Sequence, residues 1–157
     1  MSHAIQTRLD GRPGDYFTWA ELEVTSTGLP NKPPPDVRVN LMVLVQTVLD
    51  PLRKHLGRPV HVMSAYRSPE VNAKIGGSKT SAHMSGNAAD IKVVGLDAHQ
   101  IVEAIRLADL DFDQLVAYSP SRGAHVHIGI RAGQWPRHRH QLLWAPASGG
   151  YEAYKAP

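Results

Sequence analysis

The stretch DQLVAYSPSRGAHVHIGI (Asp113–Ile130) decides the fold, because it predicts a β-hairpin. Its two arms, DQLVAYS and AHVHIGI, combine alternating side chains with β-branched and aromatic residues, which is typical of strands. Between them, Pro120–Gly123 holds the proline, serine and glycine that favour a tight turn. We therefore predict two antiparallel strands that are neighbours in one sheet.

The second arm carries two histidines, His125 and His127, separated by one residue. Successive side chains of a strand point to opposite faces of a sheet, so these two imidazoles point to the same face. Another predicted strand, AADIKVV (88–94), contains Asp90, and His83 lies in the Gly/Ser-rich loop before it. If the two strands are close in one sheet, the aspartate and these histidines converge.

Helical periodicity and capping residues outline the rest of the chain. The best predicted helix spans Val37–Gly57, where apolar residues recur at helical spacing and Pro51 is expected to kink the end. We also expect a short helix within Thr18–Val24, a strand over Pro59–Arg67, a short helix capped by Ser68, and an amphipathic helix over Leu96–Leu110. The predicted fold class is therefore α+β, with a central antiparallel sheet covered by flanking helices.

Composition limits the kind of protein and the kind of site. The chain has 157 residues, of which 42% are hydrophobic, enough for one domain with a real core. It contains no cysteine, so disulfides and thiolate sites are excluded, and a metal would need His, Asp or Glu. The net charge is only +3, and no Lys/Arg block resembles a DNA-reading helix, so we expect no nucleic-acid partner.

The N-terminal region shows no secretory signal, and no apolar run is long enough to span a bilayer. We therefore expect a protein that is cytoplasmic on synthesis and does not insert into a membrane. We also expect a monomer.

Zinc suits a set of two imidazoles and one carboxylate. It accepts His nitrogen and Asp oxygen, and its catalytic sites use three protein ligands with water in the fourth position. The spacing alone leaves other interpretations open. A single His in a loop is usually a solvated side chain, and nine histidines in the chain make a chance H-x-H pair easy to find.

Two motifs add a resemblance to a known family. SAHMSGNAAD (81–90) fits the pattern S-x-H-x-x-G-x-A-x-D, and HVH (125–127) fits a later H-x-H. Together they resemble the two signatures of the zinc peptidases grouped as lysostaphin, D-Ala-D-Ala peptidase and sonic hedgehog. SAYRSPEVNAKIGGSKTSAH (64–83) is similar to the D-alanyl-D-alanine carboxypeptidase branch, which includes phage endolysins. The resemblance runs over most of Tyr16–Ile130 and implies a hedgehog/DD-peptidase-like fold.

This resemblance also implies roles for particular residues. It implies zinc on His83, Asp90 and His127. It implies that Arg67 points into the site, where its guanidinium would bind a substrate carbonyl or carboxylate and steady the developing oxyanion. Ser81 is expected to hydrogen-bond within its own loop or to the substrate.

The general base is the least defined part of the expected site. His125 corresponds to the first His of H-x-H, which assists catalysis in parts of the superfamily, whereas many relatives in the carboxypeptidase branch have Trp there. His125 is therefore expected to be a general base, an oxyanion donor, or an imidazole that only lines the site. Some members place an acidic base three residues before the last ligand, where this chain has Ala124.

Four further polar residues lie near these motifs. Asp113 and Gln114 are expected either to orient a ligand histidine or to face solvent at the sheet edge. His138 and His140, in PRHRH, form another H-x-H pair. No carboxylate motif accompanies that pair, so we expect both side chains to be solvated on the surface.

The resemblance implies a zinc metallopeptidase that hydrolyses peptidoglycan stem peptides in the manner of a D-Ala-D-Ala carboxypeptidase. Two alternatives stay open: an endolysin-type endopeptidase that cuts L-Ala-D-Glu, and a non-catalytic zinc-containing module of a phage particle or wall-binding assembly. The predicted division is a loose segment 1–15, a single zinc peptidase domain 16–145 and a tail 146–157. Without an export signal, the protein is expected to act on the cell wall after release or as part of a phage particle.

Overall fold

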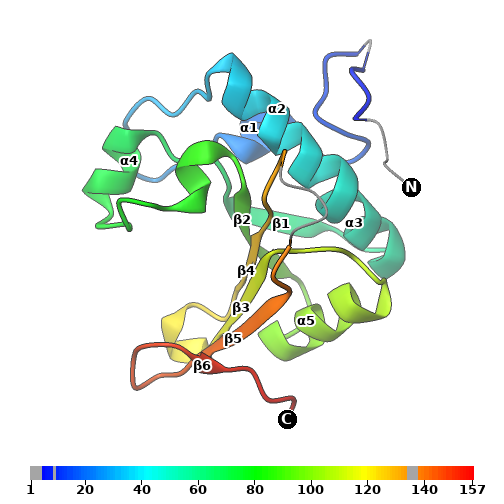
Figure 1. Cartoon of the computed structure of the whole chain (residues 1–157), viewed down its shortest axis with the longest axis vertical. Coiled ribbons are helices and arrows are strands. Elements are labelled where there is room, and N and C mark those ends of the chain that lie inside the picture. The colour runs from blue at the N-terminus through cyan, green and yellow to red at the C-terminus, as the bar shows by residue number, and fades with distance from the viewer. Residues whose placement is uncertain (1–4, 9, 134–137) are drawn as a thin grey trace.

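The computed structural model describes residues 5–8, 10–133 and 138–157 and folds them around a six-stranded sheet (Figure 1). The helical elements are α1 (Trp19–Leu22), α2 (Pro35–Leu44), the π-helical η1 (Val45–Leu49), α3 (Asp50–Leu56), α4 (Pro69–Lys74), the 3-10 turn η2 (Ala82–Ser85), α5 (Ala98–Leu107) and the 3-10 turn η3 (Pro120–Arg122). The strands are β1 (Val60–Ser64), β2 (Ala88–Val93), β3 (Gln114–Tyr118), β4 (Val126–Gly129), β5 (Gln141–Ala145) and β6 (Glu152–Ala153). In these described ranges, no helix combines the length and the apolar character needed to cross a membrane.

The sheet has the strand order β1-β2-β4-β3-β5-β6. The predicted hairpin is the antiparallel pair β3–β4, in which Val116 lies opposite His127. β2 pairs antiparallel with β4 on the other side, so that Asp90 also lies opposite His127. The predicted α+β class is confirmed. One strand differs from the expected pattern, because β5 runs parallel to β3 and makes the sheet mixed.

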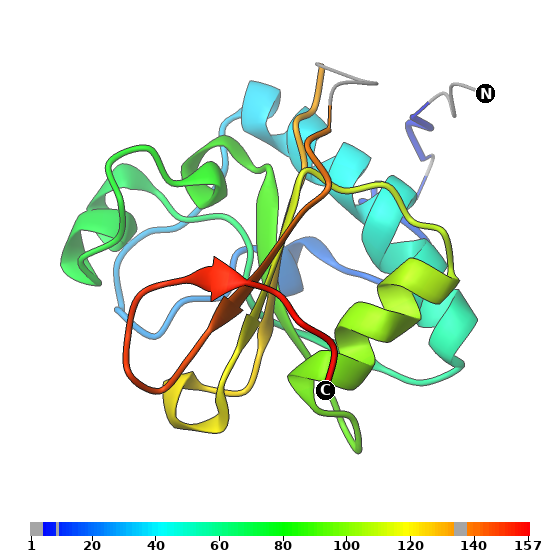
Figure 2. The same cartoon turned by 60° about the horizontal axis from the view of Figure 1, so that its bottom comes forward.

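Helices α2, α3 and α5 cover one face of this sheet. Ile91, Leu115 and Ile128 are fully buried in one hydrophobic cluster with apolar residues of those helices. Because side chains alternate along a strand, Asp90 and His127 point to the opposite face, called the open face below. Figure 2 shows α3 and α5 on one side of the sheet and α4 with the β6 hairpin on the other.

The long helix predicted over 37–57 is one helical run with a wider turn in its middle. It begins two residues earlier, at the first residue of α2, and in η1 the N–H of Asp50 donates to the carbonyl of Val45. Pro51 has no N–H and its ring crowds the carbonyl four residues earlier, so a regular α-helical ladder is interrupted here. Gly57 ends the run with a φ of 63°, as expected of a helix stop.

The strand predicted over 59–67 ends earlier, at the last residue of β1, and the chain then leaves the sheet. Asn31, which is buried, fixes the segment that follows. Its amide donates to the carbonyl of Tyr66 at 2.9 Å, and its oxygen accepts the backbone N–H of Ser68 at 2.7 Å. Ser68 caps α4 as predicted. Asn31 thereby sets the backbone position of Arg67, which lies between these two hydrogen bonds.

Asp50 attaches the N-terminal segment to the helices. Its carboxylate accepts the backbone N–H of Asp15 at 2.6 Å and that of Tyr16 at 3.1 Å. Residues 1–4 and 9 of the segment predicted to be loose lie outside the described residues. The expected domain boundaries after residues 15 and 145 stay predictions.

Asp113 anchors the chain where β5 joins the sheet. Its buried carboxylate accepts the backbone N–H of Arg139 at 3.0 Å and the Nη2 of the same residue at 2.6 Å, and Arg131 Nε lies 3.0 Å away. Gln114 donates through its side-chain amide to that of Gln141 in β5. Asp113 therefore neither orients a ligand histidine nor faces solvent, because it holds two arginines.

We expect Asp113→Asn to lower the free energy of unfolding by about 1–3 kcal/mol at neutral pH, since charge-assisted contacts are weakened. Burial alone would raise the pKa of Asp113, but hydrogen bonds and charge from Arg139, with Arg131 beside it, lower it to about 2. A carboxyl group whose pKa is depressed by folding stabilises the protein above its unfolded pKa, and this contribution is lost as the pH falls through the folded pKa. In urea unfolding, the difference in free energy of unfolding between the wild type and Asp113→Asn should therefore shrink as the pH falls from about 4 to about 2. A difference that does not depend on pH would contradict this role.

Candidate metal centre

Three side chains that can ligate a metal converge on the open face of the sheet: His83, Asp90 and His127. One potential ligand atom from each lies within 4.8 Å of the others. Asp90 Oδ1 is 2.9 Å from His127 Nδ1 and 3.3 Å from His83 Nε2. The structure thus brings together the residues whose convergence the sequence predicted, whereas their assignment as zinc ligands stays a prediction.

Asp90 and His127 owe their contact to the register of two strands, because facing side chains of antiparallel β2 and β4 lie about 5 Å apart. His83 reaches the same point from η2, a 3-10 turn within the predicted loop. Ser81 precedes this turn, and its Oγ accepts the N–H of His83 at 3.4 Å. The carbonyl of His83 accepts the N–H of Arg67 at 3.2 Å, which joins the turn to the segment after β1.

The hydrogen bonds of His83 fix which ring nitrogen faces Asp90. Its Nδ1 lies 2.7 Å from the carbonyl oxygen of Ala65, which can only accept, so Nδ1 carries the proton. In the neutral ring, Nε2 then presents a lone pair to Asp90 Oδ1, 3.3 Å away. Two lone pairs that face each other in a buried place need a positive centre between them, either a proton or a metal ion.

Burial disfavours a proton as the positive centre between His83 Nε2 and Asp90 Oδ1. His83 is 3% exposed, and burial lowers the pKa of its imidazole, so the ring is neutral at pH 7. Burial alone would raise the pKa of Asp90, but the hydrogen bond from His127 holds it well below its usual range, so the carboxylate is ionised. Imidazole nitrogens with one carboxylate form a donor set that zinc accepts. The three residues therefore fit a divalent metal ion.

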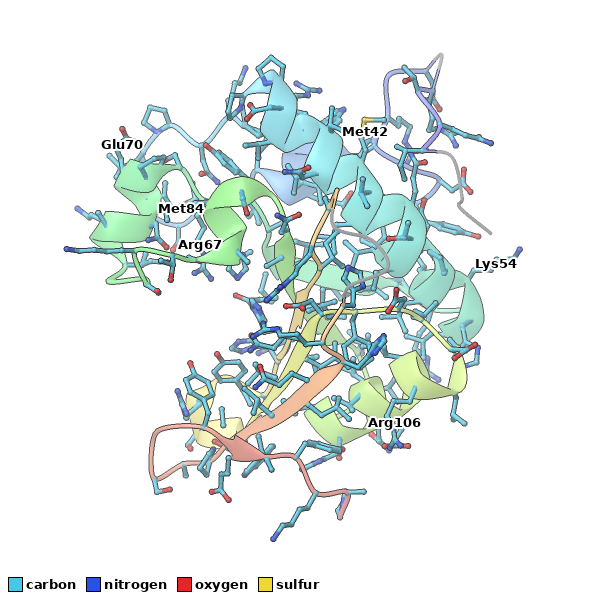
Figure 3. The ribbon with its side chains drawn as sticks, viewed as in Figure 1. Met42, Lys54, Arg67, Glu70, Met84 and Arg106 are labelled. Carbon is cyan, nitrogen blue, oxygen red and sulfur yellow. The ribbon has the colours of Figure 1, made fainter. Side chains whose placement is uncertain are left out.

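Arg67 borders the centre on the side of Asp90. Its Nη2 donates to Asp90 Oδ2 at 2.8 Å, and its Nε donates to Ser64 Oγ at 2.9 Å. Only 16% of the side chain is exposed. Figure 3 labels Arg67 on the same side of the sheet as Met84, whereas Lys54 marks the helical side. The guanidinium therefore orients the carboxylate that would ligate the metal, and its contact with substrate stays a prediction.

His125 stacks on Tyr118, the residue opposite it in the hairpin, with ring centroids 4.1 Å apart and planes at 17°. A Cβ at Gly123 would lie 2.9 Å from His125 Nδ1, so glycine leaves room for this ring. Burial lowers the pKa of His125, which favours the neutral imidazole that a general base requires. Ala124, where some relatives have an acidic residue, offers no proton acceptor. The choice among the three roles of His125 stays open on these contacts.

The expectation that His138 and His140 are solvated on the surface is wrong for His138. Only 3% of its side chain is exposed, and its Nδ1 lies 3.1 Å from Asp111 Oδ2. Its Nε2 accepts the backbone N–H of Arg131 at 3.1 Å, so the ring proton is on Nδ1 and faces Asp111. His140 is more exposed and contacts the same carboxylate. These histidines connect two chain segments, and neither nitrogen of His138 offers a metal a lone pair.

Gly86 lets the turn that carries His83 approach α2. Its φ is +73°, and a Cβ there would lie 2.7 Å from the backbone carbonyl oxygen of Val37. We expect Gly86→Ala to lower the free energy of unfolding by more than about 1–2 kcal/mol, the cost of the left-handed conformation alone, and to weaken zinc binding by moving His83. Thermal denaturation and zinc competition with a chelator measure the two effects.

Gly76→Ala is the matched control for this substitution. Gly76 also has a positive φ, of +69°, but a Cβ there would meet no atom within 4 Å. The control should therefore show the conformational cost without the collision and without any change in zinc affinity. Equal losses in the two variants would contradict the close approach to α2.

Comparison with known proteins agrees with this geometry. A family model described as Peptidase M15 matches residues 15–129, a range that contains Arg67 and all three potential metal ligands. The match ends at the last residue of β4, so β5 and β6 lie beyond it. No curated protein matches the chain.

Proposed function

The chain belongs to the peptidase M15 family, a family of metallopeptidases, and from this premise we propose that it is a zinc-dependent hydrolase of peptidoglycan stem peptides. The observation that supports the proposal best is the buried lone pair of His83 that faces the ionised carboxylate of Asp90, with His127 beside them. That arrangement calls for a cation, and its ligand set is one that zinc takes in hydrolytic enzymes.

Zinc held by His83, Asp90 and His127 would supply a Lewis acid that polarises a carbonyl and lowers the pKa of water. Other groups around the site would orient the metal ligands and stabilise charge on the substrate. The carbonyl of Ala65 fixes the tautomer of His83, and Arg67 fixes the orientation of Asp90 through Oδ2. Negative charge that develops on a substrate oxygen would be stabilised by the guanidinium of Arg67.

We assign proton transfer to His125 and a substrate contact to Ser81. The imidazole of His125 is neutral and held by its stacking on Tyr118, so one ring nitrogen can accept a proton and return it to the leaving amine. The oxygen of Ser81 already accepts the N–H of His83, which leaves its hydroxyl proton to donate to a substrate carbonyl.

The bond that we propose is the one next to a terminal D-alanine, because residues 64–83 resemble the D-alanyl-D-alanine carboxypeptidase branch. The test is digestion of purified muropeptides by the zinc-loaded protein, with new termini identified by mass spectrometry. Release of terminal D-alanine is the expected result. Cleavage between L-Ala and D-Glu would favour the endopeptidase alternative. One bound zinc per chain with wall binding and no product would overturn the proposal in favour of a non-catalytic module.

We further propose that the protein acts as a monomer, without a nucleic-acid partner or membrane insertion. It would meet the wall after release from the cell or as part of a phage particle. A net charge of +3 suits weak attraction to an anionic wall. Light scattering should give the monomer mass of 17.2 kDa, and a dimer mass at working concentration would contradict this.

A further inference from the structure

Arg122, in η3, is held in place between two tyrosines. Its guanidinium carbon lies 5.2 Å from the ring centroid of Tyr118 and 5.4 Å from that of Tyr151. Its Nη1 donates to the carbonyl oxygen of Gly150 at 2.7 Å, and the two tyrosine hydroxyls are 3.3 Å apart. One arginine therefore connects the β3–β4 turn with the β5–β6 hairpin, which lie side by side in Figure 2.

A chain of contacts connects this cluster with the metal centre. Tyr118 stacks on His125, with 4.1 Å between ring centroids. His125 precedes His127 by two residues, so the two side chains share a face about 7 Å apart along the strand. Tyr118 follows Val116, which lies opposite His127, by two residues, so its side chain is on the same face of the sheet as that histidine. Arg122 is thus part of the border of the open face around the centre.

Arg122 differs from Arg67 in what its charge faces. Arg67 is paired with Asp90, whereas in the part of the chain that the structure describes no carboxylate lies within 4.0 Å of the Arg122 guanidinium. A guanidinium has five N–H groups, and the carbonyl of Gly150 engages one side of it. Tyr151 is 59% exposed, so the cluster is open to solvent. A planar cation with open donors, held rigidly, suits a carboxylate ligand.

We propose that Arg122, with Tyr151 beside it, binds a free carboxylate of the peptide substrate. This inference rests on the proposed function. Arg67 approaches the centre from the β1 edge, is paired with Asp90 and is assigned to the oxygen that becomes negative in the reaction, so a free carboxylate of the substrate needs another cation. Arg122 supplies one from the β3 side. Two carboxylates of a stem peptide have the required chemistry: the one at its C-terminus and the free α-carboxylate of its glutamate.

The test compares zinc-loaded wild type with Arg122→Gln on a stem peptide and on two analogues, one amidated at the C-terminus and one amidated at the glutamate α-carboxylate. Arg122→Gln should raise KM for the parent peptide by about 10- to 100-fold with little change in kcat, since a charge-assisted pair is lost. The wild type should show the same rise on one of the two analogues, which identifies the carboxylate. On that analogue, Arg122→Gln should cost nothing further. Arg106→Gln, which removes an exposed arginine paired with Glu103 on α5, should change nothing.

An equal loss on all three peptides would mean that Arg122 only holds the β5–β6 hairpin, and it would overturn the inference, as would an unchanged KM. The analogues test the wild type itself, so a variant that fails to fold does not remove the test. If the wild type binds zinc but cleaves none of the peptides, the proposed function fails on its own. Calorimetry with the uncleaved parent peptide then decides the inference: amidation and Arg122→Gln should each weaken binding by about 10- to 100-fold, and equal affinities would overturn it.

Discussion

Replacing Asp90 with asparagine should leave the fold intact but abolish both zinc binding and peptide hydrolysis. Asparagine keeps the volume of Asp90 and an oxygen that can accept from His127, so the contact between β2 and β4 survives. It removes the negative charge that faces the lone pair of His83. Loss of a partner behind a ligand already costs about 10- to 100-fold in metal affinity or activity, so loss of this ligand should lower activity by more than about 100-fold.

Zinc analysis and thermal denaturation test this prediction together. Zinc at about 100 times its Kd adds about 2.7 kcal/mol of stability, which is roughly 5–10 °C in Tm for a chain of this size. That rise should appear in the wild type and in Asp36→Asn, which changes an exposed carboxylate on α2, and should be absent from Asp90→Asn. An Asp90→Asn protein with one zinc per chain and full turnover would refute the ligand role.

The part of the metal centre that lies on β2 and β4 could be predicted, because it follows from strand periodicity. HVH places His125 and His127 on one face whatever the rest of the chain does, and the short turn of the hairpin sets the register of β3 against β4. Asp90 lies in a strand whose apolar neighbours are buried, so its own side chain points the other way. Only the adjacency of β2 and β4 had to be assumed, and the structure supplies it.

The contacts that support the centre could not be predicted, because they join segments far apart in the sequence. The tautomer of His83 depends on the backbone carbonyl of Ala65, and a carbonyl carries no signal in a sequence. The segment around Ala65 depends in turn on Asn31, which sits in the proline-rich stretch 29–37 and looks like an ordinary loop residue. The amide of Asn31 is the one feature that hints at this structural role, because an amide that becomes buried must form hydrogen bonds.

The parallel strand β5 was missed for a similar reason. Its residues stand in a tail rich in glycine, proline and aromatic residues, where strand alternation is weak. In the fold, Leu142 and Trp144 pack against the main hydrophobic cluster, and Trp144 also stacks on His99 of α5 at 4.7 Å between ring centroids. His99 matched no motif, because its partner Trp144 is 45 positions away. Tertiary packing, rather than local propensity, forms strand β5.

Arg67→Ala should weaken zinc binding by about 10- to 100-fold and, with zinc saturating, still lower kcat by about 100- to 1,000-fold. The first effect follows from the 2.8 Å contact of its Nη2 with Asp90 Oδ2, because a ligand carboxylate without that partner is free to rotate. The second follows from the loss of a fixed, mostly buried cation next to the place where the proposed reaction would make a substrate oxygen negative. Zinc titration and steady-state kinetics at saturating zinc measure the two effects separately.

This separation decides what Arg67 does. If saturating zinc restores kcat in Arg67→Ala, the guanidinium acts only through Asp90, and the proposed charge stabilisation is wrong. Arg67→Lys keeps the charge but cannot reach Asp90 and Ser64 at the same time, so it should lose zinc affinity like the alanine variant while keeping more of kcat. Arg106→Ala removes an exposed arginine from α5 and should match the wild type in both measurements. If the kcat of Arg67→Lys is as low as that of Arg67→Ala, the reaction requires both contacts of the guanidinium, with Asp90 and with Ser64, and not only a positive charge.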